Sequence, residues 1–272
     1  MTKIIVAVVA ALGLAAGAWA QAPQKQPQPK SQKEVEAIMA IQNATDADGR
    51  IKAAENLITQ FADTEFKEFA LQMKTLSYQQ KNDFENMVIA GEQTLEVNPD
   101  NVVVLITLAQ AIPQRTREYD LDKEEKLAKA EKFAKKAQML IPNLAKFNPA
   151  ITDEQWTEYK KGAMSQAHEA QGMVAFTRKD FAAAEQSLKA AADVSPQPDA
   201  TTLYRLAMVY SAQTKYDEAL ATLDKSIAAG GVKVGDKDLA AEQKAVVMKA
   251  KAAKPAGGGQ AAPPPVEIKR PQ

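Results

Sequence analysis

The stretch GMVAFTRKDFAAAEQSLKAAADVSP, residues 172–196, decides the fold of this 272-residue chain. Its apolar residues recur three and four positions apart, which is the spacing of one helix face. Gly172 and Ala184 are small, and small side chains at a crossing let two helices approach to about 8–10 Å. Pro196 ends the second helix, because proline lacks the amide hydrogen that a helix interior needs. The stretch therefore predicts two packed antiparallel helices.

The same pattern recurs along the chain. Pro99, Pro142 and Pro196 each follow an aromatic residue or a leucine by fifteen positions. Between these stops the apolar residues keep helical spacing, and the underlying period is 34 residues with insertions. A fixed period of this length is typical of repeat proteins, in which each helix pair buries its apolar face only by stacking on its neighbours.

These units resemble the tetratricopeptide repeat (TPR). From Gly172 to Pro196, the small, aromatic and large apolar residues, the alanines and the proline occupy the positions of the repeat pattern. Thr75 and Met87 depart from it, because small residues belong there. The resemblance implies an all-α, right-handed superhelical solenoid of four or five repeats with a C-terminal capping helix. The expected units are residues 34–67, 68–101, 102–144 with an insertion, 165–198 and 200–233, with the capping helix at 236–252, so that the solenoid spans 34–252.

The repeat register also assigns roles to single residues. Small residues are expected where helices cross, and aromatic residues between a helix pair and its neighbour. The residues expected to pack the repeats are Tyr78, Phe84, Ala130, Gly172, Phe181, Ala184, Ala207, Tyr210, Tyr216 and Ala219.

In TPR proteins, a concave groove lined by the first helix of each repeat binds the partner. Carried over by register, the groove residues are Phe69, Gln72, Leu76, Gln79, Ile106, Gln110, Glu169, Met173, Phe176, Tyr204 and Met208. We interpret this lining as uncharged and apolar, with methionines that adapt to varied partners, and as suited to an apolar helix or an extended segment. The lysine and asparagine pair with which chaperone adaptors of the family grip a C-terminal carboxylate is absent.

The two ends of the chain differ from the repeats. Residues 1–20 combine Lys3, an apolar run and the small-x-small sequence Ala18-Trp19-Ala20, which is typical of a secretory signal peptide. An uncleaved membrane anchor is the alternative, and only then is membrane contact expected. Residues 21–33, rich in proline and glutamine, and 253–272, rich in proline, glycine and alanine, predict a disordered linker and tail. We expect an exported protein, either periplasmic or secreted.

Composition and motifs argue against catalysis. Thirty-four basic residues balance thirty-four acidic ones, so no general attraction to nucleic acid is expected, and there is no cysteine for a thiolate or disulfide. The single histidine, His168, lies where a packing side chain belongs. Residues 230–237 lack the lysine of a phosphate-binding loop, because Asp236 follows Gly235. We expect no enzyme activity, cofactor, metal or small-molecule substrate.

Two features lie outside the repeats. Residues 113–125 form an insertion that is either a solvated connection or a contact site. Thr152 and Gln155 form a capping box that opens a helix of about 25 residues ending near Thr177. Trp156 and Tyr159 in its first turns either pack on the preceding unit or form an exposed interface.

Two functions follow from the sequence. The first is a scaffold of the cell envelope that binds a protein or peptide in its groove. The second is a structural solenoid that associates with itself or fills its own groove.

Overall fold

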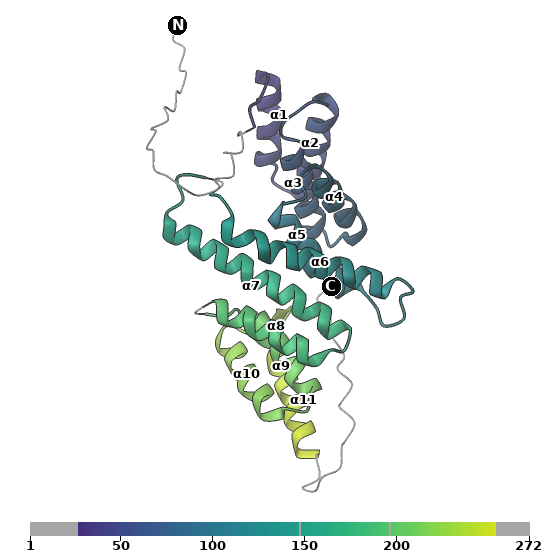
Figure 1. The fold of residues 1–272 in the computed structure, drawn as a ribbon, viewed down its shortest axis with the longest axis vertical. Helices are drawn as coiled ribbons and strands as arrows, with labels where there is room; N and C mark the ends of the chain where they lie inside the picture. Colours follow the sequence, from purple (N-terminus) through teal and green to yellow (C-terminus); the bar gives the residue numbers. More distant parts are fainter. Residues whose placement is uncertain (1–26, 147, 196, 254–272) are drawn as a thin grey trace.

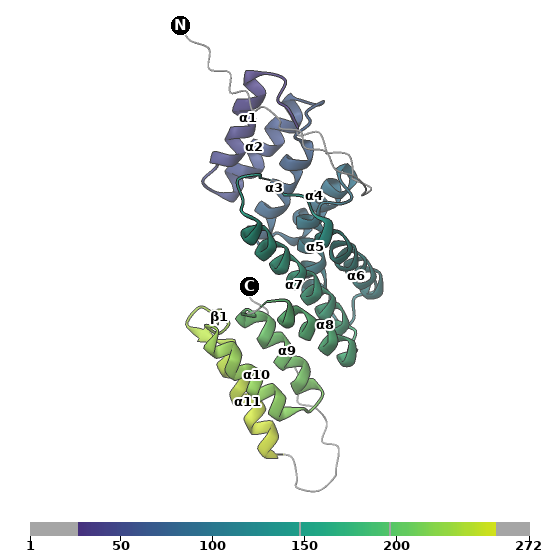
Figure 2. The ribbon, with the colours of Figure 1, turned by 60° about the vertical axis from the view of Figure 1, so that its left-hand side comes forward.

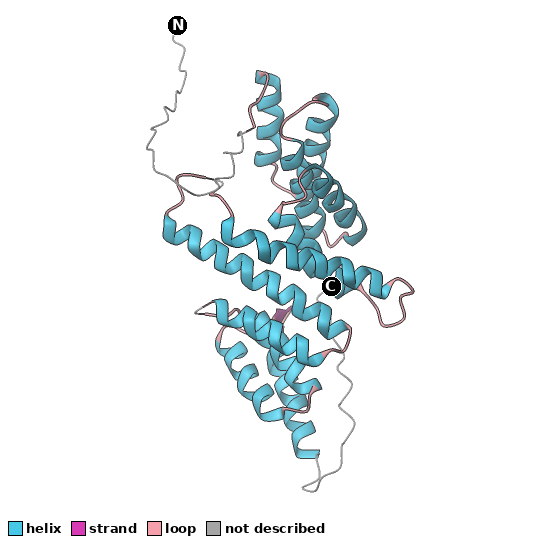
Figure 3. Cartoon of the chain, in the orientation of Figure 1, coloured by secondary structure: helices cyan, strands magenta, loops and turns pink. Residues whose placement is uncertain are grey.

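The computed structural model describes residues 27–146, 148–195 and 197–253. Because the sequence alternates helical apolar spacing with short stops, these ranges fold into eleven α-helices and one small hairpin (Figure 3). The helices are α1 (Gln32–Asn43), α2 (Ala47–Gln60), α3 (Lys67–Gln80), α4 (Phe84–Val97), α5 (Val102–Arg115), α6 (Lys123–Leu140), α7 (Asp153–Thr177), α8 (Phe181–Val194), α9 (Ala200–Ala212), α10 (Tyr216–Ala228) and α11 (Leu239–Ala253). A short 3-10 helix, η1 (Ile141–Asn143), follows α6.

Consecutive helices pack as pairs, and the pairs stack into an elongated array. The pairs are α1 with α2, α3 with α4, α5 with α6, α7 with α8 and α9 with α10, while α11 covers α10. The chain advances from α1 at one end to α11 at the other (Figures 1 and 2). The expected fold class, an all-α solenoid of stacked helix pairs, is confirmed. None of the described helices is both long enough and apolar enough to span a bilayer.

Three of the turns within the pairs share one backbone geometry. Asn82, Lys179 and Thr214 have positive φ angles of 56°, 65° and 59°. At the last of these turns the amide of Lys215 donates to the carbonyl oxygen of Tyr210 at 2.9 Å, and the other two turns make the equivalent bond. This six-to-one bond satisfies a carbonyl that the helix end leaves unpaired. The repeat is therefore visible in the hydrogen bonds as well as in the sequence.

Small residues lie at the helix crossings. Ala130, Ala184, Ala207 and Ala219 are completely buried. Gly172 of α7 is buried as well, and a methyl group added there would lie 2.6 Å from Cγ of Leu188 on α8. The remaining packing residues contact the hydrophobic clusters: Tyr216 is buried, while Tyr78, Phe84, Phe181 and Tyr210 are half-buried.

The long helix α7 begins as the capping box predicts. The hydroxyl of Thr152 accepts from the amide of Gln155, whose side chain accepts from the amide of Thr152. Trp156 is buried and donates its indole N–H to the carbonyl of Leu144 at 3.2 Å. Tyr159 stacks on it with ring centroids 4.9 Å apart. The aromatic pair therefore packs on the segment that follows α6 rather than forming a separate interface.

The structure corrects two expected boundaries. Pro113 lies inside α5 and is buried, so the insertion is only the loop 116–122. A hairpin of β1 (Lys233–Val234) and β2 (Lys237–Asp238) precedes the capping helix, which therefore begins at Leu239 instead of residue 236. Pro113 costs α5 the hydrogen bond to the carbonyl of Ala109, and the helix ends two residues later, at Arg115. The hairpin forms because the positive φ of Gly235 closes a tight turn.

The expected linker is ordered where the structure describes it. The amide of Gln28 donates to the Glu65 carboxylate, and the ammonium of Lys30 contacts the Asp63 carboxylate at 2.6 Å. Ser31 caps α1, which begins at Gln32, so the expectation of disorder up to residue 33 is wrong. Ala253, the first residue of the predicted tail, is still part of α11. The predicted signal peptide at 1–20, the start of the linker at 21–26 and the tail at 254–272 lie outside the described residues.

Candidate functional site: the face of the first helices

The first helices of successive pairs, α3, α5, α7 and α9, carry the predicted groove residues. Five of these residues are buried: Ile106, Glu169, Met173, Phe176 and Met208. Ile106 packs in a cluster with Ala163 and Ala167 of α7, while Phe176 and Met208 share another cluster between α7 and α9. The prediction of an open groove is wrong at these five positions. Ile106, Phe176 and Met208 pack between successive first helices, and all five side chains are too buried to offer an open surface to a partner.

The expectation of an uncharged lining is also wrong. The carboxylate of Glu169 on α7 accepts a short hydrogen bond from the guanidinium of Arg205 on α9. The side-chain amide of Gln110 on α5 lies 3.4 Å from the other carboxylate oxygen. Burial raises the pKa of Glu169 above its ordinary value, while the positive charge of Arg205 opposes that rise. One carboxylate thus joins the first helices of three consecutive pairs.

A second polar connection lies between α3 and the start of α5. The side-chain amide of Asn101 donates to the side-chain oxygen of Gln72 and to the carboxylate of Glu68, both at 2.7 Å. Asn98 also donates to Glu68, at 2.6 Å. Gln72 is therefore held by its neighbours and is not free to bind a partner through the same oxygen.

Three other predicted groove residues are half-buried. Phe69 packs against the cluster of the first helix pairs, and Leu76 lies one turn before the end of α3. Tyr204 contacts two clusters, and desolvation raises the pKa of its hydroxyl. Phe69 and Tyr204 therefore contribute to packing.

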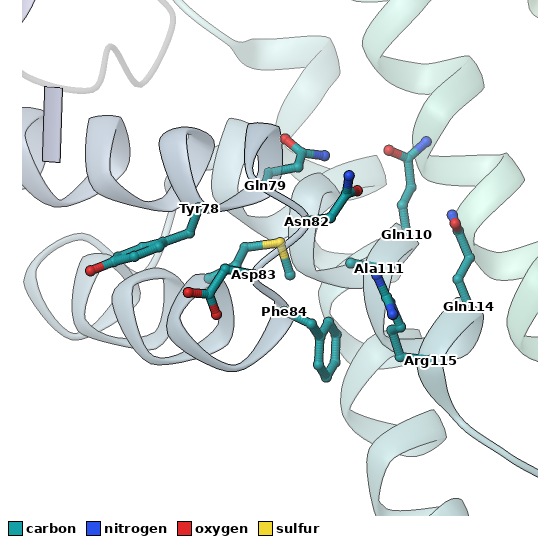
Figure 4. Close-up of a pocket in the computed structure, with 10 residues that line it drawn as sticks. Tyr78, Gln79, Asn82, Asp83, Phe84, Gln110, Ala111, Gln114 and Arg115 are labelled. Carbon is teal, nitrogen blue, oxygen red and sulfur yellow. The ribbon is translucent and has the colours of Figure 1, made fainter. Parts of the chain in front are cut away.

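The two remaining predicted residues, Gln79 and Gln110, line one open cleft. It lies between the end of α3, the turn into α4 and the last turns of α5 (Figure 4). Its full lining is Tyr78, Gln79, Asn82, Asp83, Phe84, Met87, Gln110, Ala111, Gln114 and Arg115. We call it the carboxamide cleft, because the side-chain amides of Gln79, Asn82, Gln110 and Gln114 reach toward its same side in Figure 4.

The chemistry of this cleft is hydrogen bonding. Each carboxamide offers two N–H donors and one carbonyl acceptor, the same groups that an extended backbone needs for its own carbonyls and amides. Arg115 adds a permanent positive charge, and Phe84 and Met87 add apolar surface to the lining. An arrangement of this kind can hold an extended peptide segment through its main chain.

The repeat register did not place Asn82, Gln114 or Arg115 in the groove, although Gln114 and Arg115 belong to the stretch 113–125 that was considered as a contact site. Gln114 follows Gln110 by four residues, so helical spacing alone places both on one face of α5. Asn82 belongs to the turn, and its positive φ directs its side chain to the cleft. That position could not be found from the repeat pattern, which describes helices and not the turns between them.

The single histidine, which the sequence offered as a candidate for catalysis, lies within the packing of α7. His168 is half-buried on α7, and desolvation lowers the pKa of its imidazole, which favours the neutral form. Within the described ranges, no three histidine, aspartate or glutamate side chains gather as a possible metal site.

Comparisons with known proteins agree with this geometry. Residues 175–231, which cover α8, α9 and α10, match the tetratricopeptide repeat family. A crystal structure of a thermophilic TPR protein from Thermus thermophilus is similar in fold, with a TM-score of 0.52. That likeness covers 80% of this chain and 96% of the other, at 18% sequence identity. No curated protein matches the sequence.

The fold of this protein is therefore a helical solenoid of the tetratricopeptide-repeat type. Residues 175–231 carry the repeat that is recognised by sequence, and the helix pairs on either side continue the same architecture. Solenoids of this class generally mediate protein–protein interaction, through the extended surfaces that their stacked repeats create.

Proposed function

We propose that this protein is a non-catalytic interaction scaffold of the cell envelope, and that it holds an extended partner segment in the carboxamide cleft. The observation that carries the proposal is the convergence of four side-chain amides from two helices and one turn on a single open cleft. The placement in the envelope rests on the signal-like sequence of residues 1–20 alone.

The cleft suits a main chain better than a charged side-chain motif. Four of its residues are carboxamides, whereas Asp83 and Arg115 contribute one charge of each sign. Asp83 already accepts from the amide and the side chain of Asn86, so it is occupied in capping α4. What remains for a partner is the carboxamides of Gln79, Asn82 and Gln114, the acceptor oxygen of Gln110, whose amide already donates to Glu169, and the one charge of Arg115. Because neutral hydrogen-bonding groups outnumber the single charge, the cleft favours a peptide main chain over a charged motif.

The experiment compares two variants of the full chain. Gln79→Ala/Gln114→Ala removes two side-chain amides that open onto the cleft and hold no neighbouring helix in place, so the fold is expected to keep its melting temperature. Gln186→Ala removes an exposed glutamine of α8 far from the cleft and is the control. Partners captured from an envelope extract are identified with the unmodified chain, purified, and titrated against each variant.

We expect the cleft variant to bind its purified partner about tenfold more weakly, since each lost hydrogen bond contributes about 0.5–1.5 kcal/mol. The control should bind like the unmodified chain. Equal binding by both variants would reject the cleft. Recovery of a homodimer alone would instead favour the self-associating solenoid. Sequencing the N-terminus of the mature protein tests export separately, because cleavage as predicted leaves Gln21 first.

A further inference from the structure

The loop between α5 and α6, residues 116–122, presents two apolar side chains to solvent. Tyr119 is 93% exposed and Leu121 is fully exposed, more than any other large hydrophobic residue in the described part of the chain. The loop projects beyond the helices at one edge of the solenoid (Figure 1). Burying such side chains is favourable and exposing them is not, so an exposed aromatic and leucine on one short loop call for an explanation.

The loop is held in place by a set of polar contacts. The carboxylate of Glu118 contacts Lys179, in the turn between α7 and α8, at 2.8 Å and Lys123 at 3.1 Å. Asp120 accepts from the backbone amide of Arg117 at 3.0 Å. The buried hydroxyl of Thr116 donates to the carbonyl of Ile112 at 2.8 Å.

These contacts mean that Tyr119 and Leu121 are presented on a fixed support. A binding surface that is ordered before it meets its partner loses less conformational entropy on association. Aromatic side chains presented in this way are the commonest anchors of protein interfaces.

Charge indicates what the loop binds. The three carboxylates of the loop are matched within it and around it: Glu118 by two lysines, and Asp120 and Asp122 by Lys126 at 3.5 and 2.9 Å. The guanidinium of Arg117 has no carboxylate within 4.0 Å among the described residues. Arg117 acts on Asp120 only from beyond ion-pair distance, so its guanidinium is able to pair with a carboxylate of a partner.

We propose that this loop is a second docking surface, and that it inserts Tyr119 and Leu121 into an apolar recess of a folded protein whose rim carries a carboxylate opposite Arg117. A bilayer fits less well, because two apolar side chains and one arginine give only a weak hold on a membrane, whereas stable anchoring takes a larger apolar surface or a polybasic patch. The docking surface uses none of the residues of the carboxamide cleft. Binding by the loop can therefore be tested independently of binding by the cleft.

The first test is photo-crosslinking in the cells that make the protein. The full chain carries p-benzoylphenylalanine at position 119 or, as a control, at position 139, where Met139 is 69% exposed on α6. We expect one discrete adduct from position 119 and none from position 139. The crosslinked site in the partner should lie in an apolar recess with an aspartate or glutamate at its rim.

The second test measures affinity for the purified crosslinked protein. Tyr119→Ser/Leu121→Ser should weaken binding by about 30-fold or more, the effect of losing an interface anchor. Arg117→Glu should weaken it further as the ionic strength falls, because repulsion replaces attraction. Met139→Ser should bind like the unmodified chain, and all the variants should keep its melting temperature, since the changed side chains are exposed.

Four outcomes would overturn the proposal. They are an adduct between two copies of the chain, no adduct specific to position 119, unchanged affinity of the loop variants, and sedimentation with phosphatidylglycerol vesicles that Tyr119→Ser/Leu121→Ser abolishes. Loss of binding in Gln79→Ala/Gln114→Ala but not in the loop variants rejects the loop and leaves the cleft standing. The reverse result rejects the cleft alone.

Discussion

Glu169 of α7 and Arg205 of α9 form an ion pair in which the carboxylate is almost completely buried while the guanidinium keeps some contact with solvent. The two residues are 36 positions apart, and α7 and α9 are the first helices of successive pairs. A buried charge is stable only with a partner, because desolvation opposes ionisation. The packing of α7 against α9 therefore depends on Arg205, which neutralises the buried carboxylate.

Arg205→Met should destabilise the protein by about 3 kcal/mol at pH 7, since it leaves the Glu169 carboxylate buried without its counter-charge. The double variant Glu169→Gln/Arg205→Met should recover most of this loss, because it removes the charge that lacks a partner. Chemical denaturation followed by circular dichroism measures both. A double variant no more stable than Arg205→Met would show that the pair is not the cause.

The loss in Arg205→Met should also depend on pH. Burial raises the pKa of Glu169 above 4.5 in the folded protein, and removing the positive charge of Arg205 raises it further. An acid whose pKa is higher in the folded state contributes stability that is fully present below its unfolded pKa and is lost as the pH rises through its folded pKa. The difference between Arg205→Met and the unmodified chain should thus shrink as the pH falls from 7 toward 5. A difference that grows would contradict the assignment.

Gly172→Ala and Gly162→Ala should have opposite effects, although both change a glycine of α7. A methyl group at position 172 meets Leu188 at 2.6 Å, whereas nothing lies within 4 Å of position 162. We expect overpacking to destabilise the first variant by about 1–3 kcal/mol. The second should gain up to about 1 kcal/mol from helix propensity. Thermal unfolding of the two proteins side by side checks this, and equal melting temperatures would argue against close packing of α7 on α8.

Thr214→Gly should stabilise the protein by about 1 kcal/mol. Thr214 is β-branched and has a φ of 59°, a conformation that glycine adopts without strain and threonine does not. Thr214→Ala keeps a Cβ atom and serves as the control, with a much smaller change expected. An equal gain in both variants would mean that the branched side chain, and not the Cβ atom at a positive φ, is the source of strain.

Ala219→Leu should destabilise the protein by about 1–3 kcal/mol, because Ala219 of α10 is completely buried in the cluster that includes Leu223 and Val247. Ala221→Leu places the same side chain on the exposed face of the same helix and should leave stability within about 0.5 kcal/mol. Guanidinium unfolding of both variants gives the comparison. An unchanged midpoint for Ala219→Leu would contradict the repeat register itself.

The cleft shows why the site was harder to predict than the fold. Gln79 and Gln110 were found by register, but Ile106 and Phe176 occupy groove positions of the same pattern and are buried. Whether such a position is open depends on how closely the next first helix approaches. That distance is a property of two helices together and cannot be read from either one.

The sequence by itself determined the helices of this protein and their pairing. Helical spacing and the capping box at Thr152 act within one or two turns of chain, and the small residues at 172 and 184 act between helices that are adjacent in the sequence, so nearby residues were sufficient. Only the tertiary structure decided the surface: the pairing of Glu169 with Arg205, the cleft at Gln79 and Gln110, and the exposure of Tyr119 and Leu121. These features join residues far apart in the chain, and burial and electrostatics depend on distances in space.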